Sequence, residues 1–497
     1  MTTLLVLAVY LAGVLSIGLF AHRLFRGTGE DYAVATRSIG PFVLLMSLFG
    51  THMTAFSLLG ASGEAHRVGV GVFSLMASSS AIVVPLVFYF IGTRLWAAGK
   101  RHGYLTQAQY FRDRFQSDRL GLALFVVIVA LVVPYLLIGV LGGGLTLTQI
   151  TNGLVPSWVG GLVISIVVVT YVAYGGLRGT AWVNTFQTLV FMILGAFTLI
   201  FLLRQLGGLE SALARVGAAR PDLLVRGDAV PIAKLLSYTL VPLSAGMFPH
   251  LFTHWLSAKR LDTFKLPIVA YPLCMLVVWV PSVLLGVLGH IDFPDLTGPA
   301  SSSVLVRMIA LHAPEVLAGL LGAGVFAAVM SSLDSQVLAL SNMFSHDIVR
   351  HYRSSWGFAG AMTDRQQVLA GRLFVIAIVV LTYLLSLVAT TTIFGMAVWS
   401  FTGFAGLFPI VVAAVWWRRT TTAGVWAALG TVVLLWLVFF VDGWNVPGYS
   451  VAGTGILPIV PVVAGSALAL VVVSLLTRPP ERAHLSRFFP ETAARRS

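Results

Sequence analysis

The sequence predicts an all-α polytopic membrane protein of about 13 transmembrane helices, and three observations support this fold class. Hydrophobic residues make up 58% of the 497 residues and charged residues only 10%, whereas a soluble domain carries about 25% charged residues. Apolar runs of about 20 residues, the length that crosses a bilayer, recur along the chain. Most Lys and Arg residues fall between those runs. The composition excludes a soluble enzyme, a disordered chain and a disulfide scaffold, since Cys274 is the only cysteine.

Thirteen apolar segments qualify as spans by length and composition. Their predicted limits are 2–20, 39–61, 69–98, 120–143, 159–177, 184–205, 230–256, 266–289, 314–343, 367–388, 393–416, 422–441 and 454–476. The loops between them are too short to hold a separate soluble domain.

The basic residues predict the orientation in the membrane. Loops that follow odd-numbered spans carry 22 of the 31 Lys and Arg residues, and loops that follow even-numbered spans carry 5. Basic loops stay in the cytoplasm, so we expect an integral protein of a bacterial cytoplasmic (inner) membrane, with the N-terminus outside and the C-terminus inside. This placement explains the net charge of +13 without nucleic acid. A basic face can attract anionic membrane lipid, and no obligate protein partner is predicted.

Two spans contain helix-breaking or polar residues near their middle. Residues 46–57 combine Gly, Thr, His and Thr, and residues 240–250 place Pro242 and Pro249 around Ser-Ala-Gly, where a continuous helix is not expected. The two spans are five apart, and an odd number of helices inverts the second run relative to the first. This pattern is typical of an inverted-repeat transporter with broken helices around a central site. The alternative is a pair of simple kinks, which Gly and Pro often produce in membrane helices.

The ninth span carries a small polar face. Ala328, Ser331 and Ser332 are spaced i, i+3, i+4, so they share one side of a helix. Two hydroxyls and a carbonyl suit a small hard cation, although the same pattern also serves as a packing face between helices. Asp334 is an acid inside the span, which indicates either a functional group or a side chain facing a cytoplasmic vestibule.

Four stretches of the sequence carry a recognisable combination of motifs: 37–40, 104–115, 174–187 and 327–335, the last followed by Asp347-Ile348. Together, and in this order and spacing, they resemble the sodium:solute symporter family, which includes sodium-coupled proline, pantothenate, monocarboxylate and galactose carriers. The resemblance implies a LeuT-like transporter core, a five-plus-five inverted repeat.

The resemblance also implies a division of the chain. An extra N-terminal transmembrane helix is expected in 1–30, the first inverted repeat (spans 2–6) in 31–207 and the second (spans 7–11) in 208–417. Two C-terminal transmembrane helices follow in 418–477, and 478–497 form a basic cytoplasmic tail.

By motif position, the family's sodium site falls on this chain's Gly50, Met53, Ala328, Ser331 and Ser332. The first three offer backbone carbonyls and the two serines offer hydroxyls. The site coincides with the polar face of the ninth span, so sodium is the expected co-transported ion.

The sequence departs from the family pattern at three positions. His52 stands where proline-type members have an aspartate, Asn184 where an acid is usual, and His254 where an arginine follows the Pro-His pair that ends in His250. The missing acid at 184 argues for one sodium ion rather than two. Because histidine titrates near neutral pH, a proton could replace or accompany sodium; the alternative is a neutral histidine hydrogen-bonded within the bundle. Asn184, His250, His254 and Asp334 are candidate coupling or gating residues.

The predicted function is sodium-coupled symport of a small polar solute by alternating access. The solute is expected to carry a carboxylate, as an amino acid or a short monocarboxylate does, because half-helix N-termini favour anionic groups. The alternatives are a proton-coupled transporter of the same fold and a symporter-like membrane sensor. No HExxH, GxSxG with partners or paired acids predicts an enzyme. The candidate solute-binding residues are Ser47, Thr51, His52, Thr54, Ser244, Phe248 and Trp399.

Overall fold

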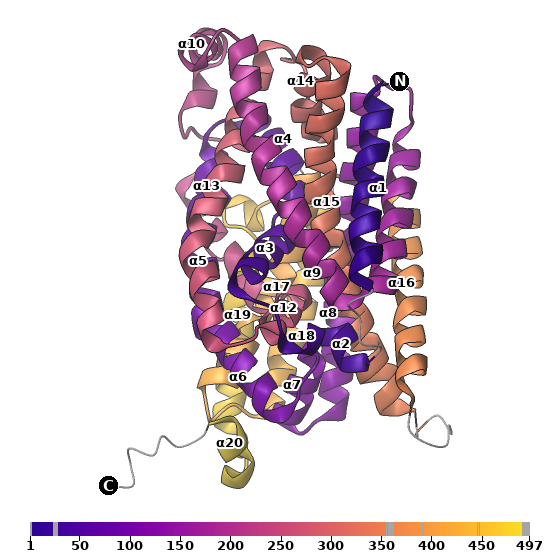
Figure 1. Cartoon of the computed structure of the whole chain (residues 1–497). Coiled ribbons are helices and arrows are strands. Elements are labelled where there is room, and N and C mark those ends of the chain that lie inside the picture. The colour runs from indigo at the N-terminus through magenta and orange to yellow at the C-terminus, as the bar shows by residue number, and fades with distance from the viewer. Residues whose placement is uncertain are drawn as a thin grey trace.

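Helices that run close to a common axis make up the computed structural model (Figure 1). The structure describes residues 2–22, 28–353, 355, 362–389, 391–444, 446 and 448–489. Within these ranges it contains no β-strand, and one isolated bridge pairs Ile39 with Ala258. The all-α prediction is therefore confirmed. The last eight residues of the expected basic tail, 490–497, lie outside the described ranges.

The long helices are predominantly apolar and account for most of the bundle. They are α1 (Thr2–His22), α8 (Asp118–Ile150), α9 (Ser157–Gln205), α13 (Lys265–Leu288), α15 (Glu315–Met343), α16 (Asp364–Ser386), α17 (Ile393–Trp416), α18 (Thr422–Gly443) and α19 (Ile459–Leu476). A further continuous helical segment, 73–102, contains α5 (Ser78–Val87), η4 (Phe88–Gly92) and α6 (Thr93–His102).

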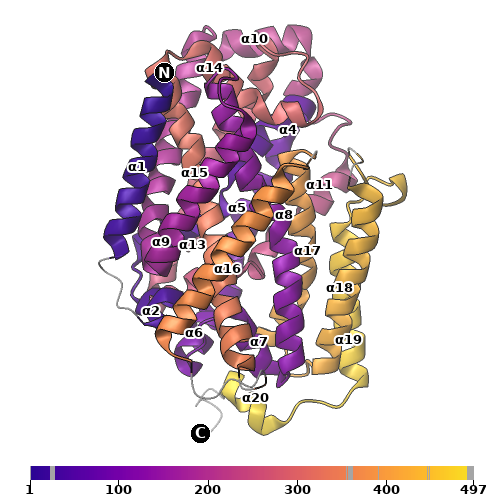
Figure 2. The same cartoon turned by 90° about the vertical axis from the view of Figure 1, so that its right-hand side faces the viewer.

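Shorter elements lie at the two ends of the bundle or at helix breaks (Figures 1 and 2). They include α2 (Gly29–Val34), α3 (Pro41–His52), η2 (Phe56–Gly60), α4 (Ala61–Val68), α7 (Gln107–Phe115), α10 (Leu209–Ala219), α11 (Ile232–Tyr238), η6 (Val241–Gly246), α12 (Pro249–Ser257), η7 (Leu261–Phe264), α14 (Val304–His312) and α20 (Arg482–Phe488).

Ten of the described helices are long and apolar enough to cross a membrane, or up to twelve if each of two bent pairs is one span. The difference from the expected thirteen lies in α9, whose 49 residues cover two predicted spans. A Cβ atom added at Gly18 of α1 would lie 2.7 Å from Tyr171 and 3.6 Å from Val183. Those two residues would be about 18 Å apart in a straight helix, so α9 folds back on itself. The count of thirteen stays a prediction.

Gly176 makes the reversal in α9. Its φ of 55° and ψ of −161° are non-helical and lie in a region that is open almost only to glycine. A Cβ atom there would also lie 2.8 Å from the ring of Tyr32. Both the backbone conformation and the close packing therefore require glycine.

Both predicted helix breaks are confirmed. The segments Pro41–His52 and Phe56–Val68 are bent by 55°, and Ile232–Gly246 and Pro249–Ser257 by 49°. In the first break, the Thr54 hydroxyl accepts a hydrogen bond from the Phe56 amide at 2.9 Å, which caps the helical segment that follows.

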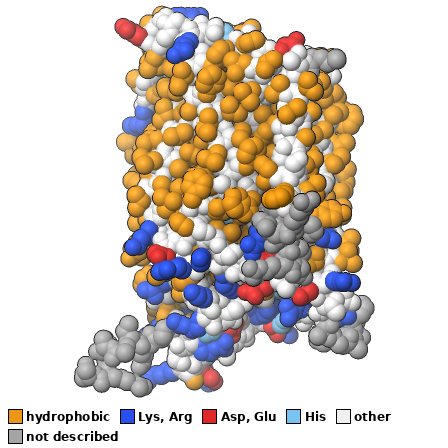
Figure 3. All heavy atoms as spheres, viewed as in Figure 1, with side chains coloured by type: hydrophobic (Ala, Val, Ile, Leu, Met, Phe, Trp, Pro, Cys, Tyr) orange, Lys and Arg blue, Asp and Glu red, His pale blue; other side chains and the backbone are white. Residues whose placement is uncertain are grey.

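The two ends of the bundle differ in charge. Lys and Arg side chains gather at the lower end in Figure 3, below a broad hydrophobic band. At this end Ile39 and Ala258 connect the start of α3 to the end of α12. Arg37 strengthens that connection, because its guanidinium donates to the carbonyls of Leu256 at 3.1 Å and Tyr104 at 2.8 Å. The start of the first broken helix and the end of the second are thus joined at the basic end of the bundle.

Replacing Gly176 by alanine should lower the free energy of unfolding by about 1–3 kcal/mol, because alanine disfavours this backbone conformation and its methyl group would meet Tyr32. Gly195→Ala, in the same helix, is the matched control, since a Cβ atom there meets nothing within 4 Å. Thermal unfolding of the purified protein in detergent checks both variants. Equal midpoints for Gly176→Ala and the wild type would contradict this role.

Candidate ion and solute site

The break after α3 is joined to α15 by a serine. The Ser331 hydroxyl donates to the Gly50 carbonyl at 2.9 Å and also lies 3.1 Å from the Ala328 carbonyl of its own helix. The last backbone hydrogen bond of α3 runs from Met53 to Phe49, so the Gly50 carbonyl lies where the regular helical pairing ends. Three of the five expected sodium ligands therefore meet at one point.

The other two expected ligands, Met53 and Ser332, are buried and stand close in the sequence to Gly50 and Ser331. Met53 has an extended backbone, with φ −89° and ψ 93°, and follows directly after α3. The Ser332 hydroxyl lies 3.1 Å from the Val329 carbonyl within α15. Gly50 allows the close approach of the helices, because a Cβ atom there would lie 2.0 Å from the Thr188 hydroxyl. The site thus offers carbonyl and hydroxyl oxygens, which suit a hard cation.

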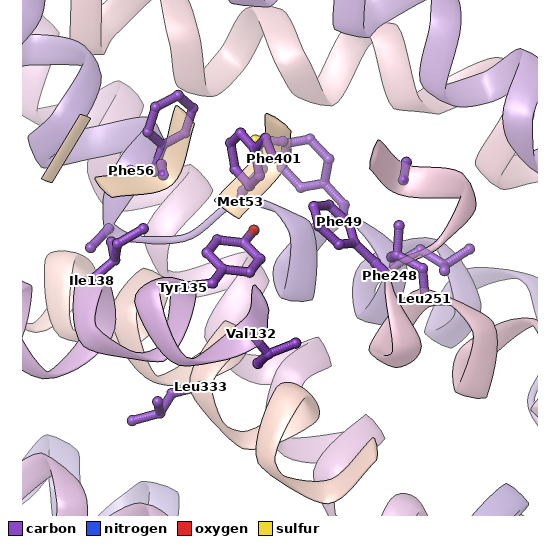
Figure 4. Close-up of a cluster of buried hydrophobic side chains, with 14 of the residues drawn as sticks. Phe49, Met53, Phe56, Val132, Tyr135, Ile138, Phe248, Leu251, Leu333 and Phe401 are labelled. Carbon is purple, nitrogen blue, oxygen red and sulfur yellow. The ribbon is translucent and has the colours of Figure 1, made fainter. Parts of the chain in front are cut away.

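An aromatic cluster surrounds the same break (Figure 4). The His52 ring hydrogen-bonds the Tyr271 hydroxyl, and the Tyr135 hydroxyl donates to the His52 carbonyl at 3.3 Å. The Phe248 ring lies 5.8 Å from His52 and 5.6 Å from Phe401. Phe248 belongs to the second break, so this cluster brings the two broken helices together around His52.

The remaining expected solute residues are placed differently. Thr51 is buried, and its hydroxyl has no hydrogen-bond partner among the described residues. Ser244 is buried in η6, and Thr54 caps the segment after the break. The Ser47 hydroxyl lies 3.4 Å from the Ala181 carbonyl on α9, so it is turned to that helix. Trp399 lies apart from His52, in a separate cavity.

This cavity, of about 460 Å³, lies between α4, α11, α17 and α18. We call it the vestibule. Trp399 packs beside Tyr449 in its wall, with ring centroids 6.2 Å apart. Phe394 also lines the vestibule and contacts Phe56 at 5.0 Å, while Phe56 lies 5.4 Å from Phe401. Aromatic rings therefore separate the vestibule from the cluster around His52.

Three of the four candidate coupling residues lie around Ser335. The Asn184 amide donates to the Ser335 hydroxyl at 2.7 Å, and a ring nitrogen of His254 lies 3.3 Å from the same hydroxyl. The neighbouring Asp334 accepts a hydrogen bond from the Tyr171 hydroxyl at 2.9 Å. Its other carboxyl oxygen is buried without a hydrogen-bond partner in the described part of the chain. The acid Asp334 on α15 and the amide Asn184 on α9 therefore lie in the same cluster.

His250 belongs to the aromatic cluster instead. Its ring stacks on Phe248 with centroids 5.0 Å apart and lies 5.9 Å from Tyr135. Neither ring nitrogen has a hydrogen-bond partner among the described residues. His250 and His254 are four residues apart in the sequence but lie in different clusters. His250 lies at the break, and His254 lies beside Ser335.

Three tyrosines at these sites were missed in the sequence. Tyr135, Tyr171 and Tyr271 each sit within an apolar span, and each directs its hydroxyl to a polar group of another helix. A tyrosine deep in a span needs such a partner, so its presence there was a usable signal. Which helix it contacts depends on the fold.

The sequence matches a family model and several characterised relatives over most of its length. The sodium:solute symporter family matches residues 32–432. The osmoregulated proline transporter OpuE of Bacillus subtilis is 25% identical over 97% of this chain and 96% of its own length. The sodium/proline symporter of Escherichia coli is 24% identical over 98% and 95%, and its sodium/pantothenate symporter is 28% identical over 70% and 73%.

Solved structures show the fold. A Na⁺-coupled sialic acid symporter in a substrate-bound outward-open state superposes with a TM-score of 0.80 at 16% identity, over 97% of this chain and 99% of that one. The nucleobase-cation-symport-1 transporter Mhp1 gives a TM-score of 0.60 at 15% identity, over 92% and 97%. The fold is therefore the LeuT-like inverted-repeat fold of these transporters. With the family match covering most of its length, the chain belongs to the sodium:solute symporter family, whose members are membrane transporters and not enzymes.

Proposed function

We propose that the protein is a symporter that uses sodium to import a small solute bearing a carboxylate, either an amino acid or a short monocarboxylate. The contact between the Ser331 hydroxyl and the Gly50 carbonyl carries the proposal, because it joins α15 to the broken helix at the expected ion site. The relatives are named as proline and pantothenate transporters. Both of those solutes carry a carboxylate.

Sodium would bind between α3 and α15. The ligands are the carbonyls of Gly50, Met53 and Ala328 and the hydroxyls of Ser331 and Ser332. In the structure the Ser331 hydroxyl donates its hydrogen to a carbonyl; a hydroxyl rotates to suit its partner, so it can turn a lone pair to a cation. The ion would then hold the broken helix in the position that completes the solute site.

The solute would bind beside the two breaks. A new helical segment starts after each break, at Phe56 and at Pro249, and the partial positive charge of a helix N-terminus favours a carboxylate. The rings of His52 and Tyr271 and the hydroxyl of Tyr135 supply polar atoms in an otherwise aromatic cluster.

The charge of the vestibule also suits an anionic group. Glu64 forms an ion pair with Arg67 at 2.7 Å, and Lys234 lies in the same lining. The pair is neutral as a whole, so Lys234 leaves this lining with a net positive charge. A solute with a carboxylate would therefore be attracted on its way to the central site.

Asp334 is proposed to act as the acid that the family pattern usually has on the sixth span. Asn184 occupies that position, and it contacts Ser335, the residue next to Asp334. The carboxylate is thus present in the same cluster but comes from the opposite helix. The absence of an acid at 184 therefore no longer limits the carrier to one sodium ion.

The repeats and the orientation complete the proposal. The boundaries 31–207 and 208–417 each begin before one broken helix, and the two broken helices are joined at their outer ends through Ile39 and Ala258. We assign the lower, basic end in Figure 3 to the cytoplasm, because basic loops stay on that side. The N-terminus then lies outside and the described end of the chain inside.

The charge of the solute determines how far the sodium gradient can accumulate it. One sodium ion gains about 2.3 kcal/mol from a potential of ~100 mV and about 1.4 kcal/mol from a tenfold gradient. Together these support accumulation of a zwitterion by roughly 500-fold. A monovalent anion carried with one sodium cancels the electrical part and gains only about tenfold. A second sodium ion would restore the electrical driving force.

Sodium should raise the unfolding midpoint of the purified protein, because a ligand that binds only the folded state stabilises it. Titrating NaCl against choline chloride at constant ionic strength measures the rise. Ser331→Ala and Ser332→Ala should each reduce it by more than half. Ser282→Ala is the control, because its hydroxyl donates to the Val278 carbonyl within α13, away from the expected ion ligands. If acid pH raises the unfolding midpoint and sodium does not, the carrier is proton-coupled. If neither sodium nor acid pH changes the midpoint, a sensor is favoured.

Exchanging His52 for alanine should weaken solute affinity at least tenfold while leaving sodium binding in place, because the ring lies at the break but is not among the ion ligands. Uptake of radiolabelled proline or lactate into proteoliposomes with an imposed sodium gradient provides the affinity. Ser47→Ala is the control, since that hydroxyl is turned to α9. An unchanged affinity in the His52 variant would exclude it from the solute site.

Exchanging the acid and the amide tests the role of Asp334. Asp334→Asn should lower sodium affinity about tenfold or more, because it removes the carboxyl group that can balance the charge of a bound cation one helical turn from Ser331. The double variant Asp334→Asn with Asn184→Asp returns the charge to the same cluster and should recover most of that loss. Sodium-dependent stabilisation and the Hill coefficient of uptake measure both effects. A double variant no better than Asp334→Asn would contradict this account.

A further inference from the structure

A second large cavity, of about 680 Å³, opens on the outside of the bundle at its basic end. It lies where η4 and α6, the start of α13 and the end of α17 meet, and none of its lining residues belongs to the α3 break or the Ser335 cluster. We call it the outer groove. Its lining residues are Tyr89, Phe90, Thr93, Arg94, Arg260, Leu261, Asp262, Phe264, Lys265, Ile268 and Trp416.

The outer groove is apolar on one side and basic on the other. Tyr89 and Phe90 are exposed on η4, and Trp416 is exposed at the end of α17. One turn after Phe90 comes Arg94, which lies within a predicted span, and Lys265 begins α13. The η4–α6 segment, α13 and α17 therefore change from apolar to basic residues at about the same depth in the bundle. Membrane helices show this change where the hydrocarbon layer meets the lipid headgroups.

The basic residues of the groove carry a net positive charge. Arg260 forms an ion pair with Asp262 at 3.2 Å, so these two charges balance. Arg94 and Lys265 have no carboxylate within ion-pair distance among the described residues. Two cations thus remain at the rim, where an anionic group would be drawn to them.

The geometry holds one of these cations in place. The Arg94 guanidinium lies 3.4 Å from the centre of the Trp416 ring, which is a close cation–π contact. The Trp416 indole donates to the Phe90 carbonyl at 3.2 Å. This chain of contacts holds the guanidinium against the aromatic floor, and its N–H groups donate no hydrogen bond to the described residues. A planar guanidinium suits the paired oxygens of a phosphate.

We propose that the outer groove binds an anionic phospholipid of the membrane leaflet on the basic side. The phosphate headgroup would lie between Arg94 and Lys265, and an acyl chain would follow Tyr89, Phe90 and Ile268 into the hydrocarbon layer. A free anion such as phosphate would use only the basic rim and leave the apolar floor exposed. The groove touches segments of both expected repeats, so a bound lipid would contact parts of the carrier that move against each other during transport.

Thermal unfolding of the full-length protein tests the binding itself. Phosphatidylglycerol added to the protein in neutral detergent should raise the unfolding midpoint more than phosphatidylcholine with the same acyl chains. The double variant Arg94→Gln with Lys265→Gln should lose at least half of that difference. Arg119→Gln with Arg365→Gln removes the same charge from exposed positions at the basic end outside the groove and should keep it.

Fluorescence locates the lipid and remains informative if the double variant folds poorly. Phosphatidylglycerol with brominated acyl chains should quench tryptophan emission, and Trp416→Phe should remove a distinct part of this quenching while keeping an aromatic ring. Equal effects of the two lipids, an equal loss in both double variants, the same rise with glycerol phosphate alone, or unchanged quenching in Trp416→Phe would each overturn the proposal. None of these outcomes depends on solute transport, so they separate this site from the proposed symport.

Discussion

The need to satisfy backbone polar groups inside the membrane governs the centre of this protein. Water is absent from the hydrocarbon layer, so an interrupted helix must find its hydrogen bonds within the bundle. Ser331 reaches the Gly50 carbonyl, and Tyr135 reaches the His52 carbonyl. The side chains that stabilise the break are therefore the ones that surround the proposed binding sites, and a bound ion would take over part of the same role.

The two broken helices are held differently at their two ends. At the basic end Arg37 and the bridge between Ile39 and Ala258 form a backbone-mediated connection. Towards the vestibule Phe56 of the first broken helix and Tyr238 of the second each pack against Phe394 of α17. Hydrogen bonds require a narrow range of distances and angles, whereas aromatic pairs form at ring-centroid distances of about 4.5–7 Å in stacked or edge-to-face orientations. The basic end is therefore held by directional contacts, and the vestibule end by ring packing that allows a wider range of geometries.

Much of the architecture was accessible from the sequence because it depends on local chemistry. Apolar length predicted the spans, paired prolines predicted the break before α12, and the spacing of Ala328 and Ser331 predicted their shared face. Asp334 was recognised as unusual, but its partner Tyr171 is far away in sequence. Two predicted spans form the single helix α9, because the chain is helical directly before and after the reversal at Gly176. Trp399 was grouped with His52 by composition, and the fold separates them by a layer of rings.

Helix α1 illustrates what such long-range packing means for synthesis in the cell. Its start bonds to α15, with the Thr3 hydroxyl 3.0 Å from the Glu315 carbonyl, and its other end packs against Tyr171 of α9. Thr3 and Glu315 are 312 residues apart, and ribosomes add about 5–20 residues each second. Helix α1 therefore waits roughly 15–60 s after its own synthesis for this neighbour. During that time lipid must cover the face that α15 later occupies, so the apolar character of α1 serves the unfinished protein as well as the mature one.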